Sequence, residues 1–224
     1  MSSTVGTKFM VAATGAILAL FVLGHMAGNL QIFLGPDTFN HYAATLKGMP
    51  GLLWIARLVL LAALVLHVAG NMKLRGRNSA ARPVAYADKK PLASTAYSRT
   101  MMVSGLILLA FIVYHLAHFT LGLLYPGFYS LTDAEGRHDV YSMVVLGFRE
   151  PLVAIPYLIA MTLLFSHLAH GVASVFQSFG VRRPAWRDGI DLAGRLFAIV
   201  VAAGNILIVL ACLAGLIEPF QEVL

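Results

Sequence analysis

Histidine is the residue type through which this chain could do chemistry. Six of its eight histidines lie well inside long apolar stretches: His25, His67, the pair His115 and His118, and the pair His167 and His170. An imidazole at membrane depth is costly, so it indicates a functional group with a partner. Four such positions on four helices are the number needed to bind two haems through two histidines each. The histidines therefore predict a di-haem cytochrome b.

Length and composition favour a membrane protein. The 224 residues are 59% hydrophobic and 12% charged, and the apolar residues fall in runs of about twenty or more, the length that crosses a hydrocarbon core of roughly 30 Å. The run over residues 9–34 lacks a small-residue cleavage pattern, so we expect a retained helix instead of a secretory signal. The single cysteine, Cys212, excludes an intramolecular disulfide and a cysteine-bound iron–sulfur cluster on this chain.

The pattern predicts an all-α integral membrane protein that forms a single domain over residues 1–224. Five transmembrane helices are expected at about residues 7–34, 51–75, 98–125, 150–178 and 190–216. Proline and glycine support their ends at Gly35-Pro36, Pro50-Gly51, Pro126-Gly127, Pro151 and Pro219. We expect the first four helices to form a bundle around two stacked haems. The fifth has no histidine and should pack or face lipid, with Asn205 in an interhelical hydrogen bond.

The basic residues predict the orientation. Most flank the start of the first helix and the second and fourth connections: Lys8, Lys73, Arg75, Arg77, Arg82, Lys89, Lys90, Arg99, Arg182, Arg183, Arg187 and Arg195. The opposite face has Lys47, Arg57, Arg137 and Arg149. The positive-inside rule then predicts that the N-terminus lies in the cytoplasm and the C-terminus outside. The expected location is a bacterial cytoplasmic (inner) membrane. The net charge of +6 therefore reflects the topology, and we expect the basic side to form a docking surface for a partner. The sequence has no interleaved aromatic and basic pattern that would indicate nucleic-acid binding.

Topology decides which histidines can meet. In this orientation His25 lies about 26 Å along its helix from Lys8, and His115 about 24 Å from Arg99, so these two share an outer depth. His67 and His170 lie about 12 and 18 Å before the basic residues that end their helices, so they form an inner pair. His118 and His167 each share a helical face with a chosen ligand and are the fallback ligands. Gly24, Gly28, Gly70 and Gly171 either leave room for a macrocycle or allow close helix packing.

Four motifs carry a resemblance to a known family. They are Gly24-His25-Met26, Leu66-His67-Val68, the segment from Tyr114 to Phe119, and the segment from His167 to Gly180. The chain resembles, over nearly its whole length, the five-helix, di-haem cytochrome b subunit of succinate dehydrogenases and fumarate reductases. That family pattern also favours His67 with His170 for the inner haem and His25 with His115 for the outer one. In some members a glutamate lies two residues before the haem ligand on the fourth helix and belongs to a proton route. This chain has Leu168 at that position.

The resemblance implies cofactors and partners. It implies two haems b and a membrane anchor, held in lipid, that binds a flavoprotein subunit and an iron–sulfur subunit on its cytoplasmic side. Electrons from succinate would pass through the haems to a quinone, most often menaquinone in this family. The chain itself would carry out no dicarboxylate chemistry. It would be the non-flavin subunit of a succinate:quinone oxidoreductase in the respiratory chain and tricarboxylic acid cycle.

A quinone site is expected near the outer haem. Asn29, Gln31, His41 and Arg57 are the polar candidates there, and Arg57 could instead neutralise a haem propionate or snorkel to the interface. His41 could also be solvated in an outer loop, as is expected of His138.

Two other functions fit the same residues. One is the cytochrome b anchor of a hydrogenase or formate dehydrogenase. The other, less favoured, is a non-haem proton-coupled transporter, which usually brings intramembrane carboxylates or broken helices, whereas the acidic residues here lie in expected loops or at helix ends.

Overall fold

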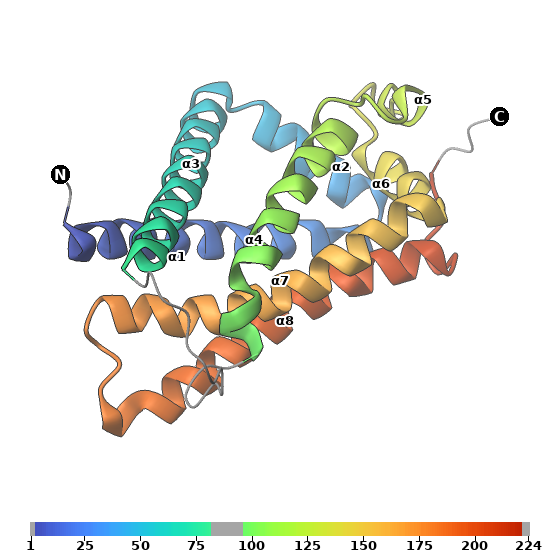
Figure 1. Cartoon of the computed structure of the whole chain (residues 1–224). Coiled ribbons are helices and arrows are strands. Elements are labelled where there is room, and N and C mark those ends of the chain that lie inside the picture. Colours follow the sequence, from blue (N-terminus) through green and yellow to red (C-terminus); the bar gives the residue numbers. More distant parts are fainter. Residues whose placement is uncertain (1–2, 82–95, 221–224) are drawn as a thin grey trace.

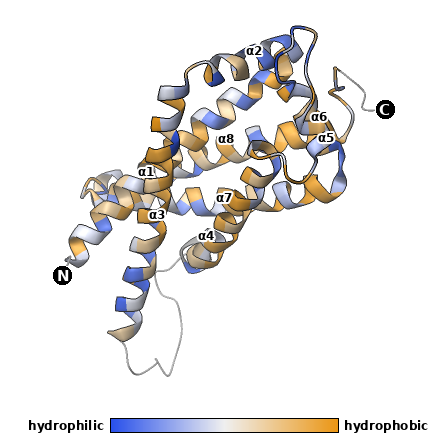
Figure 2. Cartoon of the chain, turned by 90° about the horizontal axis from the view of Figure 1, so that it is seen from above, coloured by the Kyte–Doolittle hydropathy of each residue, from blue (hydrophilic) through white to orange (hydrophobic). Residues whose placement is uncertain are grey.

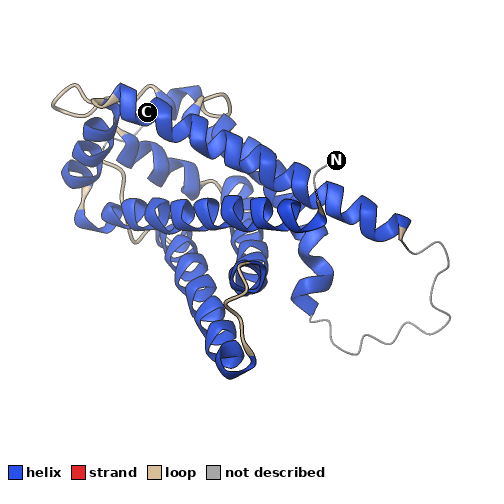
Figure 3. Cartoon of the chain, turned by 90° about the vertical axis from the view of Figure 1, so that its left-hand side faces the viewer, coloured by secondary structure: helices blue, strands red, loops and turns tan. Residues whose placement is uncertain are grey.

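Five long helices make up most of the molecule. The computed structural model describes residues 3–81 and 96–220, and every named element in this part is a helix (Figure 3). The long helices are α1 (Thr4–Asn29) with the 3₁₀ turn η1 (Leu30–Leu34), α3 (Pro50–Ala80), α4 (Ala96–His115) with the π-helix η2 (Leu116–Thr120), α7 (Pro151–Ser178), and α8 (Arg187–Leu213), which follows η3 (Pro184–Trp186). All five are long and apolar enough to cross a membrane. The prediction of an all-helical, multi-pass membrane protein is confirmed.

The outer surface of these helices is apolar. Large side chains such as Leu20, Leu58, Val103 and Leu207 are each more than half exposed, and apolar residues run along all the long helices in Figure 2. A water-soluble domain rarely exposes so much apolar surface. This surface suits the hydrocarbon core of a bilayer.

Proline and glycine set most helix ends where the sequence predicts them. Gly35 has φ +98°, a conformation that favours glycine, and Pro36 starts the next helix. The expected end of the third spanning helix at residue 125 is wrong, because its π-helix ends at Thr120 and the chain turns at Gly122, with φ +65°. The ring of Tyr129 lies against Gly122 where a Cβ would sit.

Three short helices were not expected from the sequence: α2 (Pro36–Lys47), α5 (Pro126–Tyr129) and α6 (Val140–Arg149). With the loop over residues 130–139 they form what we call the cap. Phe39 of α2 and Val145 of α6 are buried in one apolar cluster with Ile208 of α8. The cap lies at the end of the molecule where α8 finishes, opposite the start of α1 (Figure 1).

Each long helix packs against at least one other, but not every pair of long helices is in contact. α3 packs on α1, α4 on α7, and α7 on both α1 and α8. Within the described residues, α1 shares no extensive contact with α4, nor does α3 with α7. Helix α8 packs as expected, but Asn205 donates to the carbonyl of Val201 in its own helix, so the interhelical bond predicted for it is wrong.

The end opposite the cap carries most of the basic residues that the structure describes; Arg82, Lys89 and Lys90 lie outside the described residues. Arg77 of α3 donates to the hydroxyl of Thr4 at 3.3 Å, which places the end of α3 beside the start of α1. Arg182 is held by Asp191 through two short N–H···O bonds of 2.6 and 2.8 Å. Two of the expected docking arginines therefore have partners within the chain.

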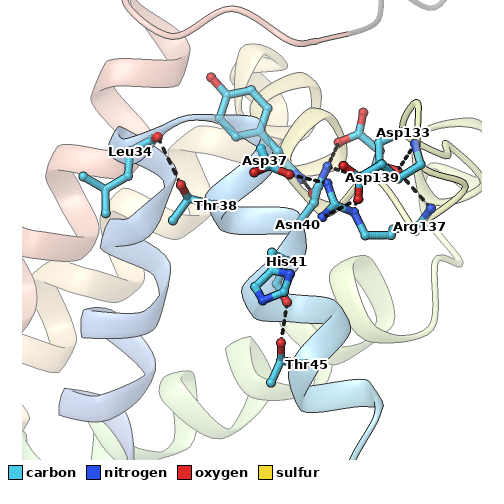
Figure 4. A network of polar contacts seen from close by, with 11 residues as sticks. Leu34, Asp37, Thr38, Asn40, His41, Thr45, Asp133, Arg137 and Asp139 are labelled. Atoms are coloured by element: carbon cyan, nitrogen blue, oxygen red, sulfur yellow. Dashed lines mark hydrogen bonds and ion pairs between the residues drawn. The ribbon is translucent and has the colours of Figure 1, made fainter.

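A polar network joins α2 to the loop of the cap (Figure 4). The fully buried amide of Asn40 donates to Asp139 at 2.9 Å and to Asp133 at 3.3 Å, and its oxygen accepts from the backbone N–H of Tyr141. Arg137 bridges Asp133 and Asp37 at 2.7 and 2.8 Å. The network closes the loop onto α2.

Replacing Asn40 with alanine should loosen the cap strongly. The change removes three hydrogen bonds and leaves the buried Asp139 carboxylate with one donor fewer, a loss of about 3 kcal/mol. We expect the midpoint of thermal unfolding in detergent to fall by roughly 10 °C. Thr45→Ala is the matched control, since Thr45 is exposed on the same helix and bonds only within it. Equal midpoints for the two variants would contradict this role of Asn40.

His138 is half-buried, so the prediction that it is solvated is wrong. Its Nε2 lies 2.7 Å from the carbonyl of Tyr129 and must donate to it, while its Nδ1 lies 2.6 Å from Nζ of Lys47 and must accept. The bond from Lys47 requires the neutral imidazole, because a protonated Nδ1 could not accept it. Burial, and after it the positive charge of Lys47, lowers the pKa of His138 below the ordinary value of 6.5. His41 is exposed as expected, although it lies on α2 and not in a loop.

Acid should weaken the cap through His138. Because its pKa is lower in the folded chain, the unfolded chain takes up a proton first as the pH falls below about 6.5, so stability is full above that pH and declines beneath it. We expect the unfolding midpoint to fall between pH 6.5 and 5.5 by more in the parent chain than in His138→Gln. Thermal melts at pH 7.5, 6.5 and 5.5 measure this difference, and parallel curves would refute it.

Candidate functional site

Two histidines meet near the cap end of the bundle. The rings of His25 on α1 and His115 on α4 have centroids 5.8 Å apart, and their planes are nearly perpendicular at 85°. Two imidazoles that bind one metal from opposite sides have centroids about 6 Å apart, given metal–nitrogen bonds of about 2 Å. The structure thus brings together the two residues that topology paired at the outer depth.

Tyr157 of α7 lies between the two histidines of the third spanning helix. Its hydroxyl is 3.3 Å from Nδ1 of His115 and 3.3 Å from Nδ1 of His118. A phenol has one proton, so it can donate to only one of these nitrogens and must accept from the other. No pattern in the sequence indicates this contact, because it depends on how α4 packs on α7.

A second set of histidines lies toward the other end of the bundle. The imidazole of His167 interacts electrostatically with those of His67 and His170. Gly15 on α1 and Gly105 on α4 lie directly against two of these rings: a Cβ added at each would be 3.0 Å from Cε1 of His67 and 3.3 Å from Cε1 of His167. The interaction with His67 favours His167, the alternative within its pair, as the partner of His67.

His170 faces different surroundings. Besides His167, its electrostatic partners are Arg182 and Asp191, at the end of the bundle opposite the cap. Among the described residues no hydrogen bond is made by its side chain. We therefore treat His170 as the less favoured ligand of the two.

A hydrogen bond fixes how His67 is protonated. Nδ1 of His67 lies 3.1 Å from the carbonyl of Val11, which can only accept, so Nδ1 carries the proton. Nδ1 of His167 lies 3.2 Å from the hydroxyl of Ser104, and the same hydroxyl lies 3.2 Å from the carbonyl of Met101. When Ser104 donates to Met101, it can accept from Nδ1 of His167 in the same way.

This protonation leaves Nε2 available for a metal. In the described part of the chain, no hydrogen bond involves Nε2 of His67, His115 or His167. A metal-bound histidine usually donates its other ring N–H to a carbonyl, hydroxyl or carboxylate, which fixes the ring and raises its basicity. Nε2 of His25 instead lies 3.2 Å from the amide nitrogen of Asn29, so Asn29 would have to turn away for His25 to bind iron.

The helix packing also suits a group between the histidines. Two imidazoles on opposite faces of a macrocycle hold their helices too far apart for backbone contact. The helix pairs that carry these histidines, α1 with α4 and α3 with α7, are pairs without extensive contact in the described residues. The donor set and the helix spacing together fit two bis-histidine haems.

Two of the four glycines singled out in the sequence pack closely against another helix, and two do not. A Cβ at Gly70 would meet Val11 and Met10, and one at Gly28 would meet Tyr42, so these two allow close packing. A Cβ at Gly24 or Gly171 would meet nothing within 4 Å. The glycines that lie against the inner histidines are Gly15 and Gly105, which the sequence did not indicate.

The polar candidates for a quinone lie near the cap. Gln31 and His41 line one open hollow of about 440 Å³ together with Asp37, Thr38, Tyr42 and Thr45. Asn29 contacts His25 as described above. Arg57 does not line this hollow: it is exposed on α3, with its guanidinium carbon 5.1 Å from the ring centroid of Trp54.

Comparisons with known proteins give no relative. No family model, curated protein or solved structure matches this chain.

Proposed function

We propose that the chain is the membrane-anchor cytochrome b subunit of a succinate:quinone oxidoreductase and binds two haems b. The observation that carries the proposal is the perpendicular pair His25 and His115, 5.8 Å apart on two spanning helices. The second pair, His67 and His167, in which each Nδ1 has a hydrogen-bond partner, supports a second haem. A bound haem supplies one-electron oxidation and reduction at its iron.

The histidines would hold the haems and the helices would set the distance between them. His67, His167 and His115 each have a partner at Nδ1 that fixes the ring while Nε2 stays free. His170 and His118 remain the alternative ligands. Apolar side chains around the bundle would keep the haems out of water, which favours electron transfer over side reactions.

The quinone and the soluble partners are proposals of the same kind. The hollow lined by Gln31 and His41 offers donors for quinone carbonyls near His25. The flavoprotein and iron–sulfur subunits would bind at the basic end, in a bacterial inner membrane with the N-terminus in the cytoplasm. Arg75, Arg183 and Arg187 are exposed there and suit an acidic surface. The choice of these subunits depends on the sequence resemblance.

One spectrum tests the haem proposal. The reduced-minus-oxidised difference spectrum of the purified chain should show b-type haem bands, and a pyridine haemochrome assay should give two haems per chain. A non-haem proton relay would give no visible bands. Copurification with peptide identification tests the partners, since a flavoprotein and an iron–sulfur protein should appear together. A hydrogenase or formate dehydrogenase in their place would name a different complex with the same cytochrome.

A further inference from the structure

Two basic residues at the cap end have no acidic partner. Lys47 closes α2 and Arg57 lies on the third turn of α3. In the part of the chain that the structure describes, neither forms an ion pair, in contrast to Arg137, which binds Asp37, Asp133 and Glu135. Burial, and after it the positive charge of Arg57, lowers the pKa of Lys47. Two like charges thus act on each other, and the described residues supply no counterion.

A hollow lies beside Lys47. It has a volume of about 350 Å³ and is lined by Ala43, Ala44, Lys47, Gly48, Arg137 and His138. Arg137 is neutralised by its three acidic partners, and His138 accepts from Lys47 as a neutral ring. The charge that this hollow offers to a ligand is therefore that of Lys47, and Arg57 on α3 adds a second positive charge that acts on Lys47. These charges call for an anion.

An apolar stripe runs along α3, the helix that carries Arg57. Trp54, Leu58, Leu61 and Val65 follow each other at helical spacing on α3, and each is more than half exposed. Trp54 also stacks with Arg57, and tryptophan is enriched at the membrane–water interface. A ligand that suits both parts needs an anionic head at Lys47 and Arg57 and a hydrocarbon chain along the stripe.

We propose that Lys47 and Arg57 bind the phosphate of an anionic phospholipid whose acyl chain lies along Trp54, Leu58, Leu61 and Val65. Basic pockets at the ends of membrane helices bind anionic lipid head groups in this way. The lipid would supply the missing counterion and cover the exposed stripe. This assignment stands apart from the haem proposal, because it uses none of the histidines in the bundle.

Lipid selection by the full-length chain tests this. The purified protein is placed in vesicles of equal dioleoylphosphatidylglycerol and dioleoylphosphatidylcholine, extracted gently, and its bound lipids are counted by native mass spectrometry. We expect bound phosphatidylglycerol in excess over phosphatidylcholine. Lys47→Gln and Arg57→Gln should each reduce the excess about fivefold, and the double variant roughly twentyfold. Arg57→Lys should retain most of it.

Control variants separate a specific site from general attraction between anionic lipid and basic side chains. Arg183→Gln removes one exposed charge at the opposite end and should leave the excess unchanged; an equal reduction there would mean general attraction to the membrane and would overturn the proposal. Competition by inorganic phosphate at millimolar concentration would reassign the site to free phosphate. Loss of a haem in Arg57→Gln would assign Arg57 to a propionate instead, and equal binding of both lipids by the parent would also reject the proposal.

Discussion

His67→Ala and His167→Ala should each remove one of two haems, whereas His170→Ala should keep both. A low-spin b haem needs two axial nitrogens. The electrostatic interaction of His67 with His167, together with a hydrogen-bond partner at Nδ1 of each, favours this pair. Loss of one axial imidazole leaves the iron with a single axial nitrogen. Haem per chain, measured by pyridine haemochrome on each purified variant, should fall from two to one.

His170→Ala is the matched control for this result. It removes the same side chain about one helical turn further along α7, where Arg182 and Asp191 are its electrostatic neighbours. If His170→Ala lost a haem while His167→Ala kept both, the pairing of His67 with His170 expected from the sequence would be restored. If the parent chain held no haem, the cytochrome proposal itself would fail.

The sequence could not choose between His167 and His170 for a physical reason. The two are three residues apart, so they share a helical face and differ in depth by only about 4.5 Å. The membrane depth of each histidine is estimated by counting residues to the basic side chains at the helix ends. The uncertainty of that estimate is larger than about 4.5 Å. The choice depends on the neighbours, Ser104 and Gly105 on α4 and Gly15 on α1, which sequence spacing cannot bring together.

The spanning helices were easier to predict than the cap. Hydropathy over twenty or more residues gives a strong signal, and Pro50 and Pro151 mark the starts of α3 and α7 as expected. The helix α2 is short and polar on average, and α6 has only ten residues. Hydropathy averaged over about twenty residues therefore does not distinguish either helix from a loop. Their order depends on tertiary contacts such as Asn40 with Asp139.

At the cap end, His25→Ala and His115→Ala should each remove the other haem, and His118→Ala should leave two. His25 and His115 face each other at the spacing of a shared metal. His118 is 3% exposed, is packed against Gly147, and stacks on Phe119. His118 therefore has a role in packing that does not require iron. A variant series measured by haem stoichiometry decides this, and loss of a haem in His118→Ala alone would exchange the two roles.

Tyr157→Phe should keep both haems but raise the midpoint potential of the one bound by His115. If Tyr157 accepts from Nδ1 of His115, the bond raises the basicity of that imidazole and favours oxidised iron. One hydrogen bond is worth about 1 kcal/mol, which corresponds to about 40 mV for one electron, given 59 mV per tenfold change in equilibrium constant. Redox titration followed by haem absorbance would measure the shift.

The matched control is Tyr114→Phe. The ring of Tyr114 packs edge-on against Tyr157 with centroids 5.8 Å apart, but its hydroxyl forms no hydrogen bond with a histidine in the part of the chain that the structure describes. We expect its potentials to match those of the parent. Because both variants lose a hydroxyl from the same aromatic cluster, a shift confined to Tyr157→Phe isolates the bond to the imidazole. Equal shifts in both would trace the effect to the polarity of the cluster, and no shift in either would mean that Tyr157 does not hold the ligand.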